Sequence, residues 1–168
     1  MLFPIPEEWS FISNNNEEVT QNDLKEMYRS LSNAIRGNID FFTPIVYGAG
    51  AAGVGTYSEQ NGVIARSIYS TDIWFNVYWT AHTGAGELRV QIPLTCDQVG
   101  GQPFVGSCEI SNGLTLAVGY TWCTCKANEN STFVNIVQNS SGVNSAAMGI
   151  QAQGRLRCHV RFFGKYNK

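Results

Sequence analysis

The stretch D-I-W-F-N-V-Y-W-T at residues 72–80 decides the fold class, because its apolar residues recur at every second position. On a strand, this period places four apolar side chains on one face: Ile73, Phe75, Val77 and Trp79. The opposite face carries Trp74 and Tyr78, so both faces are apolar. A second apolar face needs a cover. We expect packing against another subunit, with a platform for stacking sugars as the alternative.

The same period of two continues through the chain after residue 41. Further strands are predicted at 86–92, 114–118, 131–137 and 155–163. Turns rich in Gly, Asn and Ser separate them, and no helical pattern lies between them. The sequence therefore predicts an all-β fold, an antiparallel jelly-roll-like β-sandwich of about eight to ten strands.

The first 40 residues differ from the rest. The run T-Q-N-D-L-K-E-M-Y-R-S-L-S-N-A-I-R-G at 20–37 predicts a short helix, capped by Thr20 and stopped at Gly37. Its apolar stripe includes Leu24 and Leu31, and fits either a short coiled-coil seam or a helix lying on the domain. We therefore predict a lead-in at 1–40, used for attachment or trimer packing, and a head domain at 41–168.

Composition excludes several functional classes. Only 14% of the 168 residues are charged and the net charge is −2, so the chain has no electrostatic reason to bind nucleic acid or a membrane surface. No apolar run is long enough to cross a bilayer, and the N-terminus has no signal-peptide pattern. We expect synthesis in a cytoplasm.

The odd number of cysteines, five, argues against a complete disulfide framework. Cys123 and Cys125 lie two apart, so on a strand they share a face and cannot easily bridge each other. The spacing of these residues with Cys96, Cys108 and Cys158 matches no zinc site. We expect buried structural thiols and no metal.

A glycine pattern tests for a nucleotide cofactor. Gly48, Gly50 and Gly53 have the G-x-G-x-x-G spacing of a dinucleotide-binding loop. Such a loop works because a helix starts there and points its N–H groups at the phosphates, whereas a β-favouring sequence follows here. Asp72, at a plausible distance for the ribose contact, opens a strand of its own. We predict no cofactor, and a loop of small residues crossing one end of the sandwich.

Catalytic signatures are sparse. The chain has two histidines, His82 in a turn and His159 on the last strand, and no G-x-S-x-G motif. Few carboxylates fall in the β region, although a glycosidase pair among them is possible. We predict a protein that is not an enzyme, and keep a carbohydrate-active enzyme as the alternative.

The last strand concentrates positive charge on one face, formed by Arg155, Arg157, His159 and Arg161. Three interpretations remain open. The face could bind an anionic glycan or phosphate, pair across strands with partners such as Glu87 or Glu109, or form a ladder between subunits.

The segment from Thr43 to Leu94 resembles a module at the tips of phage tail fibres and related virion appendages. The matches are Thr43-Pro44, Tyr57, Gln60, Gly62, Arg66 and Gly86-x-Leu88. Ile64 stands where that family usually has Tyr, and Ile92-Pro93-Leu94 where Leu-Pro is usual. The closing strand R-L-R-C-H-V-R-F-F and the lead-in W-S-F-I with its helix are also similar. The likeness covers roughly residues 41–163.

This resemblance implies a trimeric β-sandwich head on a virion, made in the host cytoplasm, that binds a host-surface glycan or protein receptor. Other virion proteins would hold its N-terminal segment. A trimeric cellular adhesin of the tumour-necrosis-factor-like kind is a further alternative. The candidate subunit interface comprises Trp74, Tyr78, Arg155, Arg157, His159, Arg161, Leu24 and Leu31. The candidate receptor loops, 81–86, 97–106, 127–131 and 139–145, include His82, Thr83, Asn128, Asn130, Asn139 and Asn144.

Overall fold

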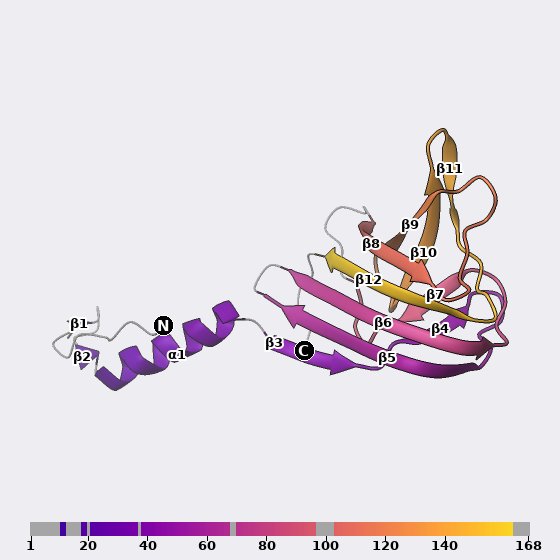
Figure 1. Cartoon of the computed structure of the whole chain (residues 1–168). Coiled ribbons are helices and arrows are strands. Elements are labelled where there is room, and N and C mark those ends of the chain that lie inside the picture. The colour runs from indigo at the N-terminus through magenta and orange to yellow at the C-terminus, as the bar shows by residue number, and fades with distance from the viewer. Residues whose placement is uncertain are drawn as a thin grey trace. The chain divides into compact units, whose positions relative to one another are not determined.

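The chain divides into two compact units, Met1–Gly37 and Asn38–Lys168 (Figure 1). The computed structural model describes residues 11–12, 18–19, 21–36, 38–67, 70–96 and 103–162. The first strand of the head, β3 (Asn38–Phe42), already contains residue 40. The head therefore begins at Asn38, before the boundary predicted from the sequence.

The first unit contains a short strand pair and the predicted helix. Strands β1 (Phe11–Ile12) and β2 (Glu18–Val19) are antiparallel, and α1 spans Gln21–Arg36. The predicted cap and stop, Thr20 and Gly37, lie outside the described residues. On the apolar stripe, Leu24 is half-buried and Met27 is 67% exposed, while the side chain of Leu31 falls outside the described part. Among the described residues, no helix is long and apolar enough to cross a membrane.

The second unit is one antiparallel sheet that curls around its core, which confirms the all-β prediction. Its remaining strands are β4 (Ile45–Gly48), β5 (Gly55–Arg66), β6 (Thr71–His82), β7 (Leu88–Gln91), β8 (Phe104–Ser111), β9 (Trp122–Ala127), β10 (Phe133–Ser140), β11 (Val143–Ala147) and β12 (Gly154–Phe162). The strand order is β3-β5-β6-β12-β8-β9-β10-β7-β4, and β11 pairs with β10. Figure 1 shows the β10–β11 hairpin projecting from the rest of the sheet.

Side chains close the seam between the two sheet edges, which are the consecutive strands β3 and β4. The Tyr57 hydroxyl accepts a hydrogen bond from the Val46 amide at 3.1 Å and donates to the Val46 carbonyl at 3.0 Å. Burial raises the pKa of Tyr57, so the hydroxyl stays protonated and fills both roles. Gln60 donates to the Pro44 carbonyl at 2.9 Å. The exposed backbone of β4 is thus satisfied without another strand.

The core lies inside the curl and uses the inward face predicted for 72–80. Ile73, Phe75, Val77 and Trp79 are all buried there, at no more than 3% exposure. Burying each such side chain contributes about 1.5–3 kcal/mol. The indole N–H of Trp79 donates to the Gln151 carbonyl at 2.9 Å, so the largest core residue leaves no polar group unpaired.

One predicted strand is wrong. Residues 114–118 form a loop, although Leu114 is buried as the alternation required. Glutamine side chains take the place of a neighbouring strand: Gln151 bonds both the N–H and the C=O of Thr115, at 3.2 and 2.6 Å, and Gln138 accepts from the Ala117 amide at 2.9 Å. Burial along the segment falls from buried Leu114 to fully exposed Val118, so the alternation here indicates neither a strand nor a continuous buried face.

The strand registers define two ends of the head. At the proximal end, where the chain enters, the register pairs are Asn38 with Arg66, Arg66 with Thr71, and Thr71 with Phe162. At the distal end, they are Trp79 with Gly154, Ser111 with Arg155, and Trp122 with Asn139. Because neighbouring strands are antiparallel, these two sets lie at opposite ends of the strands.

Candidate functional site

The basic residues of β12 share its outer face, as predicted, and each is paired within the chain. The side chain of Arg155 bonds Asn76 on β6, with an Nε–Oδ1 distance of 3.1 Å, and forms an ion pair with Glu59 on β5. Arg157 pairs with Glu109 on β8 at 3.2 Å. Cross-strand pairing is thus the arrangement observed, and Glu109 is one of the partners proposed from the sequence.

Asp72 positions the other two basic residues, His159 and Arg161. Asp72 is 7% exposed, and its carboxylate accepts from His159 Nε2 at 2.8 Å and from Arg161 Nε at 2.8 and 3.0 Å. Burial raises the pKa of Asp72, but the hydrogen bonds from Arg161 and His159 outweigh it and the pKa lies below its usual value. Asp72 is therefore a charged anchor for both side chains.

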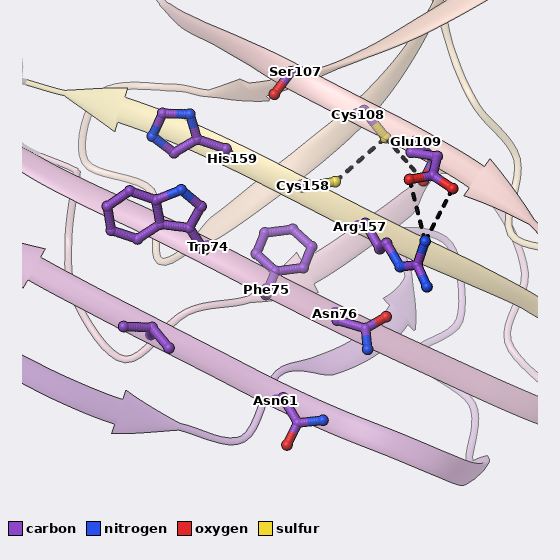
Figure 2. A pocket seen from close by; sticks show the side chains of 11 residues that line it. Asn61, Trp74, Phe75, Asn76, Ser107, Cys108, Glu109, Arg157, Cys158 and His159 are labelled. Carbon is purple, nitrogen blue, oxygen red and sulfur yellow. Dashed lines mark hydrogen bonds and ion pairs between the residues drawn. The ribbon is translucent and has the colours of Figure 1, made fainter.

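Trp74 lies on top of this network. Its ring stacks on the His159 imidazole, with centroids 4.8 Å apart and planes 8° from parallel, and the side chain is 41% exposed. Strand register continues this row through Val63 on β5 to Phe41 on β3, which is 82% exposed. Trp74 and His159 line a shallow depression of about 570 Å³, together with Asn76 and Arg157. Figure 2 shows these side chains.

Charges on this outer face balance. The ion pairs are Arg66 with Asp40, Arg155 with Glu59, Arg157 with Glu109, and Arg161 with Asp72. Four guanidinium groups thus meet four carboxylates. Glu87, the other partner considered from the sequence, pairs with Arg89 on β7 instead. The face presents apolar surface framed by neutralised charges.

The residues that carried the family likeness on β5 hold the strands next to it. Tyr57 and Gln60 close the seam to β4, as described above. Gly62 lies so close to Phe42 that an added Cβ would be 2.3 Å from its ring, and Arg66 pairs with Asp40 on β3. These residues therefore hold β3 and β4 in place beside β5.

The glycine loop is closed by its own backbone. The amides of Gly48, Ala49 and Gly50 donate to the carbonyls of Ala52, Glu87 and Ala85, at 3.2, 2.9 and 3.0 Å. Gly53 has a φ of 72°, and an added Cβ would be 2.1 Å from the Gly84 nitrogen. Strand β5 follows, where a nucleotide loop has a helix. Because these three amides already donate to backbone carbonyls, they are not available to bind a phosphate.

One of the predicted receptor residues, His82, is buried at the end of a strand and is not exposed on a loop. It ends β6 and is buried, with Nε2 3.1 Å from the Val46 carbonyl and Nδ1 accepting from the Gly84 amide at 2.9 Å. Thr83 is exposed, and its hydroxyl accepts from the Val54 amide at 2.9 Å. The buried His82 side chain therefore links the end of β6 to Val46 on β4.

The distal end gathers two predicted receptor residues, Asn139 and Asn144. The side-chain amide of Asn139 donates from Nδ2 to the Thr124 hydroxyl at 3.1 Å, and its Oδ1 accepts from the Ser145 hydroxyl at 2.6 Å. Asn144 lies on β11 and is exposed. Trp122, 48% exposed, is the register partner of Asn139.

The sequence reasoning missed Trp122 and its neighbour Tyr120. The Tyr120 hydroxyl lies 3.5 Å from the Asn144 carbonyl, which places this ring against β11. The motif G-Y-T-W at 119–122, two aromatics in a segment rich in turn residues, is the signal that could have found them. We call Tyr120, Trp122, Asn139 and Asn144 the distal cluster.

The other predicted receptor residues lie at the proximal end. Asn130 is exposed with a φ of 55°, and its amide donates to the Cys96 carbonyl at 2.8 Å. Asn128 is half-buried and shapes the same turn by accepting from Ser131. The loop at 97–102 lies outside the described residues. The predicted loops are thus divided between the two ends.

All five cysteines are free thiols. Cys96, Cys125 and Cys158 are buried, while Cys108 and Cys123 are half-buried. Cys123 and Cys125 alternate on β9 with outward-facing residues and share its inner face. In the described ranges, no three His, Cys, Asp or Glu side chains are arranged to hold a metal ion.

Comparisons with protein families, with curated proteins and with solved structures found no match to this chain. The likeness to tail-fibre tips therefore stays a prediction from the sequence. Function has to be inferred from the two surfaces described above, the outer face of β6 and β12 and the distal cluster.

Proposed function

We propose that this protein is a non-enzymatic structural protein of a phage or prophage virion, a fibre-tip or surface module that binds a host-surface glycan or protein receptor. One observation carries the proposal. The chain enters the head at the proximal end, and an exposed aromatic and amide cluster lies at the opposite end. An attachment protein needs this polarity, because the anchored end faces the particle and the other end faces the host.

The proposal includes a more specific description of the fold than one curled sheet. The curled sheet is a jelly-roll-like sandwich in which β3, β5, β6, β12 and β8 form one half and β4, β7, β10 and β9 form the other. The buried residues of both halves meet in one core. The bend falls between β8 and β9, which stay paired over only four residue pairs.

The outer face of β6 and β12 is the surface on which three copies pack. Burying an ion costs several kcal/mol unless its charge is matched, and here every arginine on the face already has a carboxylate. The exposed apolar side chains Ile39 and Phe41 on β3 and Val105 on β8, at 66, 82 and 61%, lie on the same face of the sheet as Trp74. Covering them contributes to association without leaving a charge unpaired.

The N-terminal unit supplies the second contact between copies. Helix α1 exposes Met27 on its apolar stripe, and so short a helix is marginal by itself. Packing three such stripes about an axis would bury them. The residues before α1 then serve as the attachment to other virion proteins.

The distal cluster is the recognition surface. A tryptophan face stacks on the C–H groups of a sugar ring, and amide side chains bond its hydroxyl groups. Trp122 on β9 and Asn144 on β11 offer both, and the Asn139 side chain between them on β10 bonds Thr124 on β9 and Ser145 on β11. A glycan is therefore the preferred ligand class, with a protein receptor as the alternative.

The carbohydrate-active-enzyme alternative receives no support from the carboxylates. A glycosidase needs one carboxyl with a raised pKa as general acid. The pKa of Asp72 is lowered, and Glu59 and Glu109 are held by arginines. No observation favours the cellular adhesin.

The test uses the full-length protein on an array of bacterial lipopolysaccharide and capsular oligosaccharides, together with intact cells of the same strains. Wild type should bind, and Trp122→Ala should weaken binding about 30-fold or more, as expected for an aromatic hot spot. Val118→Ala is the matched control, since Val118 is a fully exposed apolar residue in the distal loop before Trp122. Release of sugar from the bound polysaccharide, or no binding to either array or cells, would contradict the proposal.

A further inference from the structure

Three cysteines form a row on the inner face of the sheet. Strand register places Cys158 on β12 directly opposite Cys108 on β8, and their Sγ atoms are 3.3 Å apart. On the other side of β8, the Cys123 thiol donates to the Cys108 carbonyl at 3.5 Å. Figure 2 shows the close approach of the Cys108 and Cys158 sulfurs.

The backbone of this pair already suits a covalent bond. Residues directly opposite each other in an antiparallel pair have Cα atoms about 4.5–5.5 Å apart, which lies within the range of about 4.4–6.8 Å found for disulfides. The sulfurs need to approach from 3.3 Å to a bond length of about 2.05 Å. Side-chain rotation supplies such a movement without a shift of either strand.

Cys108 is the more accessible thiol of the pair and has the character of the attacking group. Cys108 is half-buried, whereas Cys158 is 5% exposed, so an oxidant meets Cys108 first. Hydrogen bonds from the Cys123 and Cys158 thiols lower the pKa of Cys108 to about 5, against the opposing effect of burial. Burial raises the pKa of Cys158, so this thiol keeps its proton and acts as donor. A thiolate is the reactive form of cysteine.

We propose that Cys108 and Cys158 are an oxidation site, a dithiol that hydrogen peroxide converts into a disulfide between β8 and β12. The Cys108 thiolate attacks one peroxide oxygen and the O–O bond breaks, which gives a sulfenic acid at Cys108. The other oxygen leaves as hydroxide and takes a proton from solvent to become water. The Cys158 sulfur then attacks the Cys108 sulfur, and the sulfenic hydroxyl leaves as a second water with the Cys158 proton. The two thiols lose two electrons and the peroxide gains them.

The consequence is a covalent staple that depends on the surroundings of the protein. Cys108 and Cys158 are 50 residues apart, and the closed loop includes β9, β10 and β11. In a reducing cytoplasm the pair stays open, and it closes when the protein meets an oxidising environment. Closing a loop of this length stabilises the folded head, because the unfolded chain loses freedom.

The experiment treats the reduced full-length protein with one equivalent of hydrogen peroxide, then labels remaining thiols with a maleimide after unfolding. We expect an intact mass lower by two hydrogens, two fewer maleimide adducts, and a Tm higher by roughly 5 °C. After trypsin, residues 158–161 should be found linked to the peptide at 90–126, with fragmentation locating the bond at Cys108.

Two variants sharpen the result. Cys108→Ser should lose the disulfide and the rise in Tm, whereas Cys96→Ser, which changes a buried thiol with a pKa raised to about 11 outside the row, should keep both. The peptide masses of oxidised wild type test the proposed disulfide even if a variant folds poorly. A bond between Cys108 and Cys123, or oxidation of Cys108 to sulfinic acid without any disulfide, would overturn the proposal.

Discussion

The outer face of β6 and β12 and the distal cluster both expose a tryptophan, but they treat their polar groups differently. Around Trp74 the charged side chains are bonded to one another, with Asp72 and its two partners at the centre. Around Trp122, the exposed Asn144 side chain makes no hydrogen bond within the described part of the chain. A face with satisfied polar groups suits permanent burial, while spare donors and acceptors suit a ligand that comes and goes. The difference supports the proposal that the first surface serves assembly and the second serves recognition.

Trp74→Glu should have the largest effect, because it should prevent assembly through the outer face while leaving the distal cluster intact. A carboxylate placed among the apolar side chains of the outer face would be buried unpaired in an assembly, so the copies should separate. Binding to a multivalent cell surface should then fall about 100-fold, since avidity is lost while each distal cluster remains intact. Retention of the protein on intact cells measures this, with monovalent oligosaccharide binding as the control. Unchanged retention would show that the face plays no part in assembly.

Asp72→Asn should test how much the satisfied network contributes to the fold. The charged hydrogen bonds to His159 and Arg161 are lost, and we expect a fall of about 2 kcal/mol in the free energy of unfolding. Asn144→Ala, at the exposed distal cluster, should change it by less than about 0.5 kcal/mol. Urea unfolding of both variants makes the comparison, and equal losses would remove the contrast between the surfaces.

Acid should weaken the outer face through the same carboxylate. The pKa of Asp72 is lowered in the folded state, so its contribution is present above the unfolded value of about 3.9 and is lost as pH falls through the lower, folded value. Wild type should therefore lose more stability than Asp72→Asn between about pH 5 and about pH 3. Urea midpoints at both pH values measure this. Parallel losses in the two proteins would contradict the role given to Asp72.

Arg157→Gln should have the smallest effect. The ion pair of Arg157 with Glu109 has both side chains about half exposed, 49 and 61%, and exposed pairs contribute little. We expect a change in unfolding free energy of less than about 0.5 kcal/mol. A thermal melt checks it, with Arg157→Lys as the variant that keeps the charge. A loss as large as that of Asp72→Asn would contradict this ranking of the two ion pairs.

Much of the fold could be predicted because local pattern and tertiary structure agree. The period of two at 72–80 and 155–163 became β6 and β12, and the capped apolar stripe became α1. The prediction of a strand at 114–118 is wrong, because five alternating residues are too short a pattern to distinguish a strand from a loop whose backbone is bonded by glutamine side chains. Whether two halves form one sheet or two depends on long-range register, which no local pattern encodes.

The candidate site was harder to predict, since its parts meet only in space. The β12 cations and Trp74 could be placed on faces by alternation, and one partner, Glu109, was foreseen. The anchoring by Asp72 was not, because it requires the register between β6 and β12. Trp122 was missed for a similar reason, since its nearness to Asn139 follows from the pairing of β9 with β10.

Sedimentation equilibrium at micromolar concentration tests the central claim most directly, by weighing wild type, Trp74→Glu and Trp122→Ala side by side. The division of roles predicts that wild type and Trp122→Ala have three times the chain mass of 18.5 kDa, while Trp74→Glu has the mass of one chain. A wild-type mass of 18.5 kDa, or a trimer that survives Trp74→Glu, would contradict it.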